Sequence, residues 1–374
     1  MKKFMLLMMV AVLIFSAFQE KAIAETKEIK TLYIRPIDDT YVDKSMSNTV
    51  FGANPKLVCG DTWGKFSFLK FDLSSIPKGA KIISVELQLF CYDKSASAGG
   101  ILIGEEPLLE ERGRSETTLT YSLLEQIAES AGAHIGGFIS GFMELDLSKI
   151  EEWRSFSFNL TSYLCYYLEE KVGKNENQIT FHLNLLGANG ELTICSKEFA
   201  AENCRPTLII SYEKIPVTLF LQPIETDVTE GMEVRIWGTT HVETSYEYLK
   251  QWLTATYLEN ATITLEYEVS NASGHKISFE RIVITDITGK FEDRFVPTII
   301  GEYSVKAVFR GTDTFSSSTS GEIKFKVMEN VDWQSKYIET RNLLYVFIVV
   351  AVAFIITTIF LLVKMFRFPL RQKT

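Results

Sequence analysis

The chain has 374 residues, of which 46% are hydrophobic and 23% charged, and its formal net charge is −9 at pH 7. This length is more than one typical domain requires. The acidic charge excludes nucleic acid and anionic lipid headgroups as partners of the main body of the chain, because both are repelled by a negative surface.

The N-terminus carries the pattern of a secretory signal. Lys2 and Lys3 precede an apolar stretch over 4–18, and the small-residue site Ala22-Ile23-Ala24 follows it. This order predicts a signal peptide over residues 1–24, cleaved after Ala24. An uncleaved signal anchor is the alternative interpretation, but the stretch is short for a membrane span.

Residues 25–214 have the pattern of a first domain built from antiparallel strands. In the segment 82–92 apolar residues alternate with polar or aromatic ones, so one face belongs to the core and the other is solvated. Helical patterns are confined to 119–131 and 160–170, which are too short for an α/β layer. We predict an all-β sandwich with helical excursions, whose other clear strands cover 66–73, 178–186 and 206–212.

A break near 213–216 begins a second domain, residues 215–328, which contains none of the cysteines. Its short strands follow one another at the spacing of an immunoglobulin-like (Ig-like) β-sandwich without the inter-sheet disulfide. The segment 246–257, rich in Tyr and Leu, is interpreted as a short helix at one end. The predicted strands cover 217–221, 233–237, 261–269, 278–284, 301–309 and 322–327.

The segment 343–363 is an apolar run without a single charge. It matches the ~20 helical residues that cross a hydrocarbon core of ~30 Å and predicts one C-terminal transmembrane helix. A polar juxtamembrane linker, 329–342, precedes it. The tail, 364–374, is basic, and the positive-inside rule places it in the cytoplasm. The predicted location is therefore the cell membrane, single-pass, with the N-terminal domains extracellular.

Candidate modification sites follow from the predicted export. The five cysteines are odd in number, so at least one stays unpaired or pairs between chains. Cys195 and Cys204 are the closest in sequence and form the candidate disulfide, although spacing leaves the connectivity open. The sequons at Asn159, Asn260 and Asn271 are candidate glycosylation sites, which would mark surface positions in a host that glycosylates.

Several segments of the first domain resemble one family. They are the acidic opening at 38–43, the turn and strand at 51–60, the run 68–80 with 83–87 after it, and the closing segments 195–198 and 205–212. Through them, residues 31–212 are similar to the DNRLRE family of carbohydrate-binding-type, jelly-roll-like β-sandwiches, also known from disaggregatase-related surface proteins of bacteria and archaea. The resemblance implies a jelly-roll-like fold and a carbohydrate-binding module.

The second domain more loosely resembles bacterial and archaeal Ig-like repeats through 289–291 and 301–311, which implies a spacer.

The middle of the first domain departs from the family pattern. Glu110-Glu111 and 118–121 stand where the family has a Trp-rich stretch, and a Gly-rich apolar segment over 131–142 follows. The glycines of that segment favour close packing under the sheet over an exposed loop that meets a partner.

The sequence offers little catalytic chemistry. Its four histidines are scattered, and HExxH, CxxC and EF-hand patterns are absent, as are the GxSxG elbow and the phosphate-binding loop. Adjacent carboxylates such as Glu105-Glu106 do not provide the separation across a cleft that glycoside hydrolysis needs. We therefore predict a protein that is not an enzyme.

Sugar binding needs a flat aromatic ring and polar groups fixed on a rigid sheet. The outward strand faces offer both, and the candidate ligand-binding residues are Trp63, Glu86, Gln88, Tyr92, His182 and Asn184. The alternative is an ordinary solvated face with Trp63 at the rim of the core.

A structural calcium ion is the one cofactor that the sequence suggests. Asp38, Asp39 and Asp43 offer carboxylate oxygens for it. The commoner role of such residues is turn and strand-entry hydrogen bonding, which is the alternative.

The predicted function is non-catalytic binding of a cell-envelope or extracellular glycan by the first domain, with the second as spacer. The alternative is a structural or adhesive protein of the envelope or surface layer, with protein partners and no sugar binding.

Overall fold

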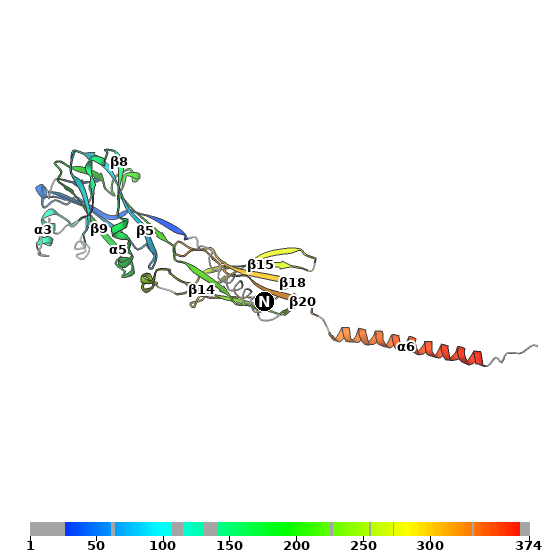
Figure 1. The fold of residues 1–374 in the computed structure, drawn as a ribbon. Coiled ribbons are helices and arrows are strands. Elements are labelled where there is room, and N and C mark those ends of the chain that lie inside the picture. The colour runs from blue at the N-terminus through cyan, green and yellow to red at the C-terminus, as the bar shows by residue number, and fades with distance from the viewer. Residues whose placement is uncertain are drawn as a thin grey trace, which may run out of the picture.

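The computed structural model describes residues 27–60, 64–106, 115–130, 141–224, 227–253, 256–271, 273–330 and 333–366. The predicted signal peptide, Trp63, Glu110-Glu111, most of the Gly-rich segment and the tail beyond Phe366 lie outside these residues. The described chain forms two sandwiches of β-sheets followed by one long helix (Figure 1).

The N-terminal sandwich consists of two antiparallel sheets. In the first sheet β5 (Lys81–Lys94) lies at the centre, and β8 (Arg154–Asn159) pairs with it. The other strands of this sheet, in spatial order around β5, are β1 (Ile29–Ile34), β11 (Thr207–Glu213), β10 (Leu192–Cys195) and β3 (Lys56–Cys59). The second sheet has the order β2 (Pro36–Asp43), β4 (Lys65–Asp72), β9 (Gln178–Leu186), β6 (Gly100–Glu105) and β7 (Gly141–Asp146).

The core of this sandwich follows the predicted alternation. In β5, Val85, Leu87 and Leu89 are buried, whereas the residues between them remain partly exposed. Phe71 of β4 and Phe181 of β9 belong to the same cluster. Each strand thus places alternate side chains in the space between the sheets, where burial of apolar surface stabilises the fold.

Two helices complete the sandwich. The helix α5 (Thr161–Gly173) packs against β5 and adds Leu164 and Leu168 to the core. The helix α3 (Tyr121–Ser130) belongs to a separate apolar cluster with Phe66 and Phe68 of β4, so it covers the outer face of the second sheet. Both helices coincide with predicted ones to within three residues at each end.

The C-terminal sandwich also has two sheets. The first has the order β12 (Val217–Leu221), β14 (Val234–Val242) and β17 (Lys290–Phe295). The second contains β13 (Val228–Thr229), β20 (Ile323–Met328), β18 (Gly301–Phe309), β15 (Thr262–Ser270) and β16 (Lys276–Ile284), with β19 (Ser318–Thr319) beside β18. The 3-10 helix η4 (Glu247–Trp252) lies within the segment predicted as a short helix.

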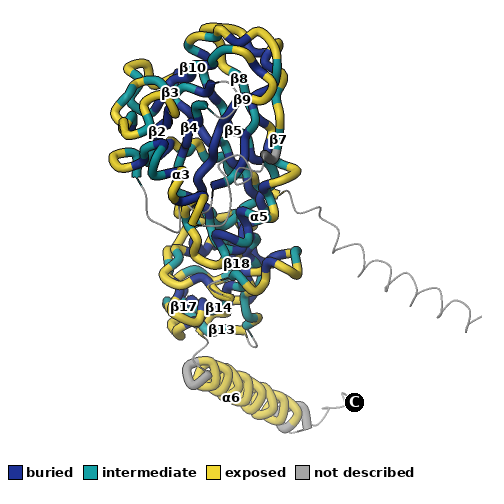
Figure 2. The backbone as a smooth tube through the Cα atoms, turned by 90° about the vertical axis from the view of Figure 1, so that its left-hand side faces the viewer, coloured by how far each residue is buried: buried dark blue, intermediate teal, exposed yellow. Residues whose placement is uncertain are grey.

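The two sandwiches pack against each other. The Tyr212 hydroxyl donates a hydrogen bond of 3.0 Å to the Asp313 carbonyl, and the Tyr248 hydroxyl donates one of 3.0 Å to the Glu169 carboxylate. At Gly173 an added Cβ would lie 2.3 Å from the Trp252 ring. One apolar cluster runs through both sandwiches. They therefore form one elongated body (Figures 1 and 2).

The helix α6 (Trp333–Phe366) contains the predicted membrane span and starts inside the predicted linker, so most of that linker is helical. Its segment Lys336–Leu362 is long and apolar enough to cross a membrane. The prediction of an all-β fold with one C-terminal apolar helix is confirmed.

Candidate functional site

The predicted ligand-binding residues occupy two different sheets. Glu86, Gln88 and Tyr92 lie on the outward face of β5, in the first sheet, whereas His182 and Asn184 belong to β9, in the second. These two groups of candidates therefore do not share one face, because the outward faces of the two sheets of a sandwich point away from each other. Period-two alternation reveals that a side chain points outward but not from which sheet.

The β9 residues are also inaccessible. His182 is 0% exposed and Asn184 is 2% exposed. Burial lowers the pKa of His182 to about 3, so the imidazole is neutral at pH 7. Because neither side chain is exposed, neither His182 nor Asn184 can contact a ligand at the surface of the second sheet.

The outward face of β5 remains partly open. Glu86 and Gln88 are half-buried, and within the described chain their side chains make no hydrogen bond. The neighbouring strand β8 places Asn159 opposite Glu86 and Ser157 opposite Gln88. The result is a strip of carboxylate, amide and hydroxyl groups on a rigid sheet. Such groups can pair with the hydroxyls of a sugar.

Tyr92 closes this strip at one end. Its ring centroid lies 3.5 Å from the Lys56 Nζ atom, 4.6 Å from the centroid of Trp153 and 5.8 Å from that of Phe199. Trp153 was not among the predicted site residues. Its signal in the sequence is weak, since it lies in a charged turn rather than in an alternating strand.

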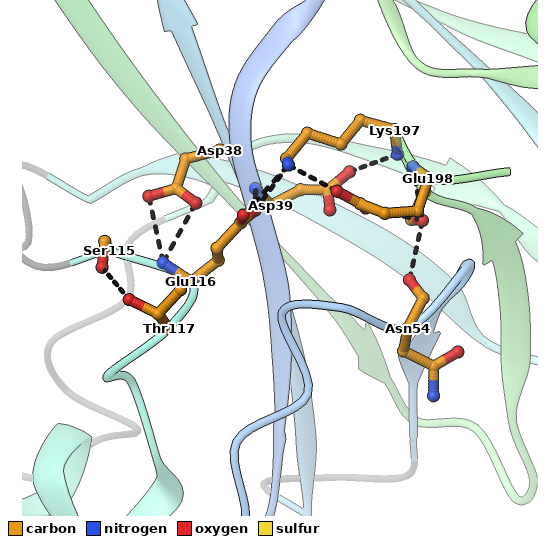
Figure 3. Close-up of polar contacts among 9 residues, drawn as sticks. Asp38, Asp39, Asn54, Ser115, Glu116, Thr117, Lys197 and Glu198 are labelled. Carbon is orange, nitrogen blue, oxygen red and sulfur yellow. Dashed lines mark hydrogen bonds and ion pairs between the residues drawn. The ribbon is translucent and has the colours of Figure 1, made fainter.

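A second group of polar residues surrounds the first half of β2 (Figure 3). Both carboxylate oxygens of Asp38 accept hydrogen bonds of 3.0 Å from the Glu116 backbone N–H, and Asp39 Oδ2 accepts one of 2.6 Å from the Lys197 N–H. The Lys197 ammonium contacts Glu116 at 2.8 Å and also pairs with Glu198. We call these five residues the β2 carboxylate cluster. It ties β2 to the segment before α3 and to the segment after β10.

Burial shapes the electrostatics of the β2 carboxylate cluster. Burial, with a contribution from Glu116, raises the pKa of Asp38 to about 6. Burial, with a contribution from Glu198, raises the pKa of Asp39 to about 8. Although burial opposes the change, hydrogen bonds to Glu116 and Glu198 raise the pKa of Lys197, so this ammonium stays charged.

Among the residues that the structure describes, three carboxylates of the β2 carboxylate cluster are close enough together to hold a metal ion. Carboxylate oxygens of Asp39, Glu116 and Glu198 lie within 4.8 Å of one another. Oxygen ligands of this kind suit calcium. However, the Lys197 ammonium already bridges Glu116 and Glu198, so an ion would have to displace it. The arrangement therefore fits internal charge compensation better than a calcium site.

Asp43, the third residue predicted for calcium, lies apart from the cluster at the end of β2. Its Oδ1 atom accepts hydrogen bonds from the Ser45 N–H at 2.8 Å and from the Ser45 hydroxyl at 2.6 Å. Its Oδ2 atom pairs with the Lys65 ammonium at 3.1 Å. This is the turn chemistry that we gave as the alternative.

The structure also describes the candidate modification residues, which are the cysteines and the sequon asparagines. All five cysteines are free thiols, so the candidate disulfide between Cys195 and Cys204 is not formed in this structure. Burial, with smaller effects of Cys204, raises the pKa of the Cys195 thiol to about 12. The sequon residues Asn159 and Asn260 are exposed, whereas Asn271 is half-buried in a turn, where its Oδ1 atom accepts hydrogen bonds from the Ser273 N–H and the His275 N–H.

Residues 30–122 match the family model of carbohydrate-binding module family 96. The match runs from β1 to the start of α3, so it includes Glu86 and Gln88 of β5 and excludes Trp153. It confirms the coarser part of the resemblance, which is a module of carbohydrate-binding type in this part of the chain. The search of curated proteins finds no match.

Solved structures give only distant likenesses. A β-glucuronidase of Bifidobacterium dentium is 7% identical, with a TM-score of 0.20, and the alignment covers 81% of this chain and 48% of that one. A transglutaminase of red sea bream is 9% identical, with a TM-score of 0.19, and the alignment covers 81% of this chain and 31% of that one. A β-1,2-glucanase of Parabacteroides distasonis is 9% identical, with a TM-score of 0.19 and coverages of 82% and 37%. The chain thus spans half or less of their lengths, and scores this low carry no argument about fold or function.

Proposed function

We propose that this chain is a membrane-anchored, cell-surface protein whose N-terminal sandwich binds a glycan without catalysis. The observation that carries the proposal is the match of residues 30–122 to a carbohydrate-binding module family. Modules of this kind are typically non-catalytic. In the described chain, the polar groups of the β5 face lie on an open sheet rather than across a cleft, which suits binding better than hydrolysis.

The face of β5 is the proposed binding surface. Glu86 and Gln88 are accessible and unpaired within the described chain, and Tyr92 adds an aromatic ring at the end of the same row. Polar groups that a rigid sheet holds in place lose little conformational freedom when a ligand binds, and this favours affinity. The buried His182 and Asn184 are not part of this surface.

Anchoring by α6 is the second part of the proposal. The 27 residues Lys336–Leu362 would form a helix roughly 40 Å long at about 1.5 Å per residue, which exceeds a hydrocarbon core of about 30 Å. Apolar side chains are exposed along this helix, for example Phe354 at 73% (Figure 2). Such a surface requires an apolar environment. The signal pattern and the basic tail support an extracellular location of both sandwiches.

The C-terminal sandwich then acts as a spacer. It lies between the N-terminal sandwich and α6 in the chain, and the packing of the two sandwiches gives the spacer a fixed orientation (Figure 1). An Ig-like architecture of this part remains our interpretation of its strand spacing.

A glycan array tests the proposal. The full chain in lipid nanodiscs is compared with a Glu86→Ala, Gln88→Ala double variant and with a matched control, Gln126→Ala and Glu302→Ala, at exposed positions outside the β5 face. We expect saturable binding that the β5 variant loses and the control keeps. If the folded wild-type chain binds no glycan, the structural or adhesive role with protein partners replaces this proposal.

A further inference from the structure

Four apolar side chains at one end of the C-terminal sandwich face solvent. They belong to the segment before β14, the residue after β17, the residue before β18 and the last residue of β20. They are Met232, Val296, Ile300 and Met328, and they are between 40% and 61% exposed. We call these four residues the β20 rim. Scattered exposed apolar residues are ordinary, whereas several at one end of a domain indicate a contact surface.

Two members of the β20 rim are neighbours in the second sheet of this sandwich. Gly301 of β18 pairs with Val327 of β20. Ile300 precedes the first of these residues and Met328 follows the second. Because the two strands are antiparallel, Ile300 and Met328 lie beside each other where the strands end.

The other two members lie in the first sheet, at the same end of the sandwich. Val234 of β14 pairs with Phe295 of β17, which brings the segment that contains Met232 beside Val296. The Met232 N–H also donates a hydrogen bond of 3.0 Å to the carbonyl of Thr229, the last residue of β13, and β13 pairs with β20. The β20 rim therefore spans the ends of both sheets.

The end of the sandwich that carries the β20 rim leads into α6 (Figure 1). Only residues 329–332 separate Met328, the end of β20, from Trp333, the start of α6. At about 3.6 Å per residue, the path from Met328 to Trp333 spans at most about 18 Å. Residues 333–342 of α6, which precede the charge-free run, rise about 15 Å at about 1.5 Å per residue. The connection is thus long enough for the rim to reach the bilayer surface and too short to carry it far away.

The charges around the β20 rim favour a lipid surface without net charge. Recognition of anionic lipids uses clusters of Lys and Arg, about four to eight together. Here acidic residues outnumber basic ones, and Lys276 of the adjoining hairpin is paired with Glu268 at 2.6 Å. The charged residues within two positions of a rim residue are Glu230, Glu233, Arg294, Glu302, Lys326 and Glu329.

We propose that the β20 rim inserts into the interfacial layer of a bilayer with zwitterionic headgroups, so that the C-terminal sandwich lies against the membrane that α6 crosses. This inference rests on the anchoring by α6 in the proposed function. Insertion removes four apolar side chains from water at the boundary between headgroups and acyl chains, as it does for interfacial helices. The contact fixes the orientation of both sandwiches above the membrane.

Methionine methyl groups provide the probes that test this contact. The methionines that follow the predicted signal peptide are Met46, Met143, Met232, Met328 and Met365. The full chain, labelled with carbon-13 at these methyl groups, is placed singly in phosphatidylcholine nanodiscs, so lipid is the only partner present. Some of the lipid carries a nitroxide near the top of its acyl chain, which broadens the NMR signal of any methyl group close to it. Replacement of one methionine at a time by leucine assigns the signals.

We expect the signals of Met232 and Met328 to lose at least about half of their intensity, because an inserted apolar group lies about 5–10 Å deep at the headgroup boundary. Met365, near the end of α6, should lose intensity too, whereas Met46, which is exposed on the N-terminal sandwich, should not. Sharp Met232 and Met328 signals beside a broadened Met365 signal would overturn the rim contact and leave the anchoring intact. A sharp Met365 signal would instead remove the anchoring itself.

A rim variant gives the second measurement. Val296→Ser combined with Ile300→Ser changes only exposed side chains, so the fold should survive. The matched control is Ile282→Ser, at an exposed position of β16 whose partner Thr264 pairs with Val308, at the other end of β18 from the rim. We expect the rim variant to recover at least about half of the lost Met328 intensity and the control to recover none. Equal broadening of Met328 in a folded rim variant would contradict insertion through the apolar rim.

Discussion

The environment of Asp39 strongly changes the pKa of its carboxyl group. Its side chain is buried beside two other carboxylates, and burial raises its pKa to about 8. A raised carboxyl pKa means that the folded state holds a proton that the unfolded state releases. Stability from this residue is therefore complete below about pH 4 and is lost as the pH rises through about 8. Glu116 acts in the opposite sense, because its pKa is lowered, mainly by hydrogen bonds from its neighbours against the effect of burial.

An Asp39→Asn variant tests this. The amide keeps an oxygen that can accept the Lys197 N–H but carries no charge. We expect it to stabilise the fold by about 1 kcal/mol or more at pH 9 and to change little at pH 4. Thermal unfolding of the full chain between pH 4 and pH 9 measures the effect, with Asp93→Asn, at an exposed position of β5, as control. A uniform loss of stability at every pH would contradict the assignment.

At the scale of elements, β17 contains a buried charge. Asp293 is 6% exposed and accepts hydrogen bonds from the Tyr267 hydroxyl at 2.8 Å and from Arg281 Nε at 2.6 Å. The three residues join β17, β15 and β16, and so connect the two sheets of the C-terminal sandwich. Removal of the carboxylate would leave a buried hydroxyl without its acceptor.

We expect Asp293→Ala to destabilise the fold by about 2–4 kcal/mol. Adding Tyr267→Phe should recover part of this loss, because the double variant no longer buries the unpaired hydroxyl. Denaturant unfolding of the four chains in this cycle gives the coupling. Strictly additive losses would show that the hydroxyl and the carboxylate do not depend on each other.

The same network explains a limit of the sequence analysis. Strands such as β9 and β12 were predicted because apolar residues recur along them, whereas β17 was missed because an aspartate occupies an inward position. Only the fold brings Tyr267 and Arg281 to that aspartate. The prediction of the binding site had the same limit. Glu86 and Tyr92 lie on one face of β5, as the alternation predicts, but the separation of His182 from this face depends on strand order, which alternation does not encode.

At the scale of the whole molecule, the contact between the sandwiches determines how the proposed glycan-binding face is presented. The N-terminal sandwich lies at the far end of the C-terminal sandwich from α6 (Figure 1). A salt bridge supplements the apolar contact, with the Lys30 ammonium 2.8 Å from the Asp313 carboxylate. Exposed pairs of this kind contribute little each, so the packed groups between the sandwiches are expected to determine rigidity.

Gly173 is the point at which this rigidity can be tested. Since an added Cβ there would lie 2.3 Å from the Trp252 ring, Gly173→Leu must push the sandwiches apart or displace the ring. We expect faster tryptic cleavage after Lys214, in the connection between the sandwiches, while glycan binding by the distant β5 face stays unchanged. Gly321→Leu is the control, because nothing lies within 4 Å of a Cβ at that position. Cleavage at the wild-type rate in Gly173→Leu would mean that the connection is already open, and the C-terminal sandwich would then be a flexible tether rather than a rigid spacer.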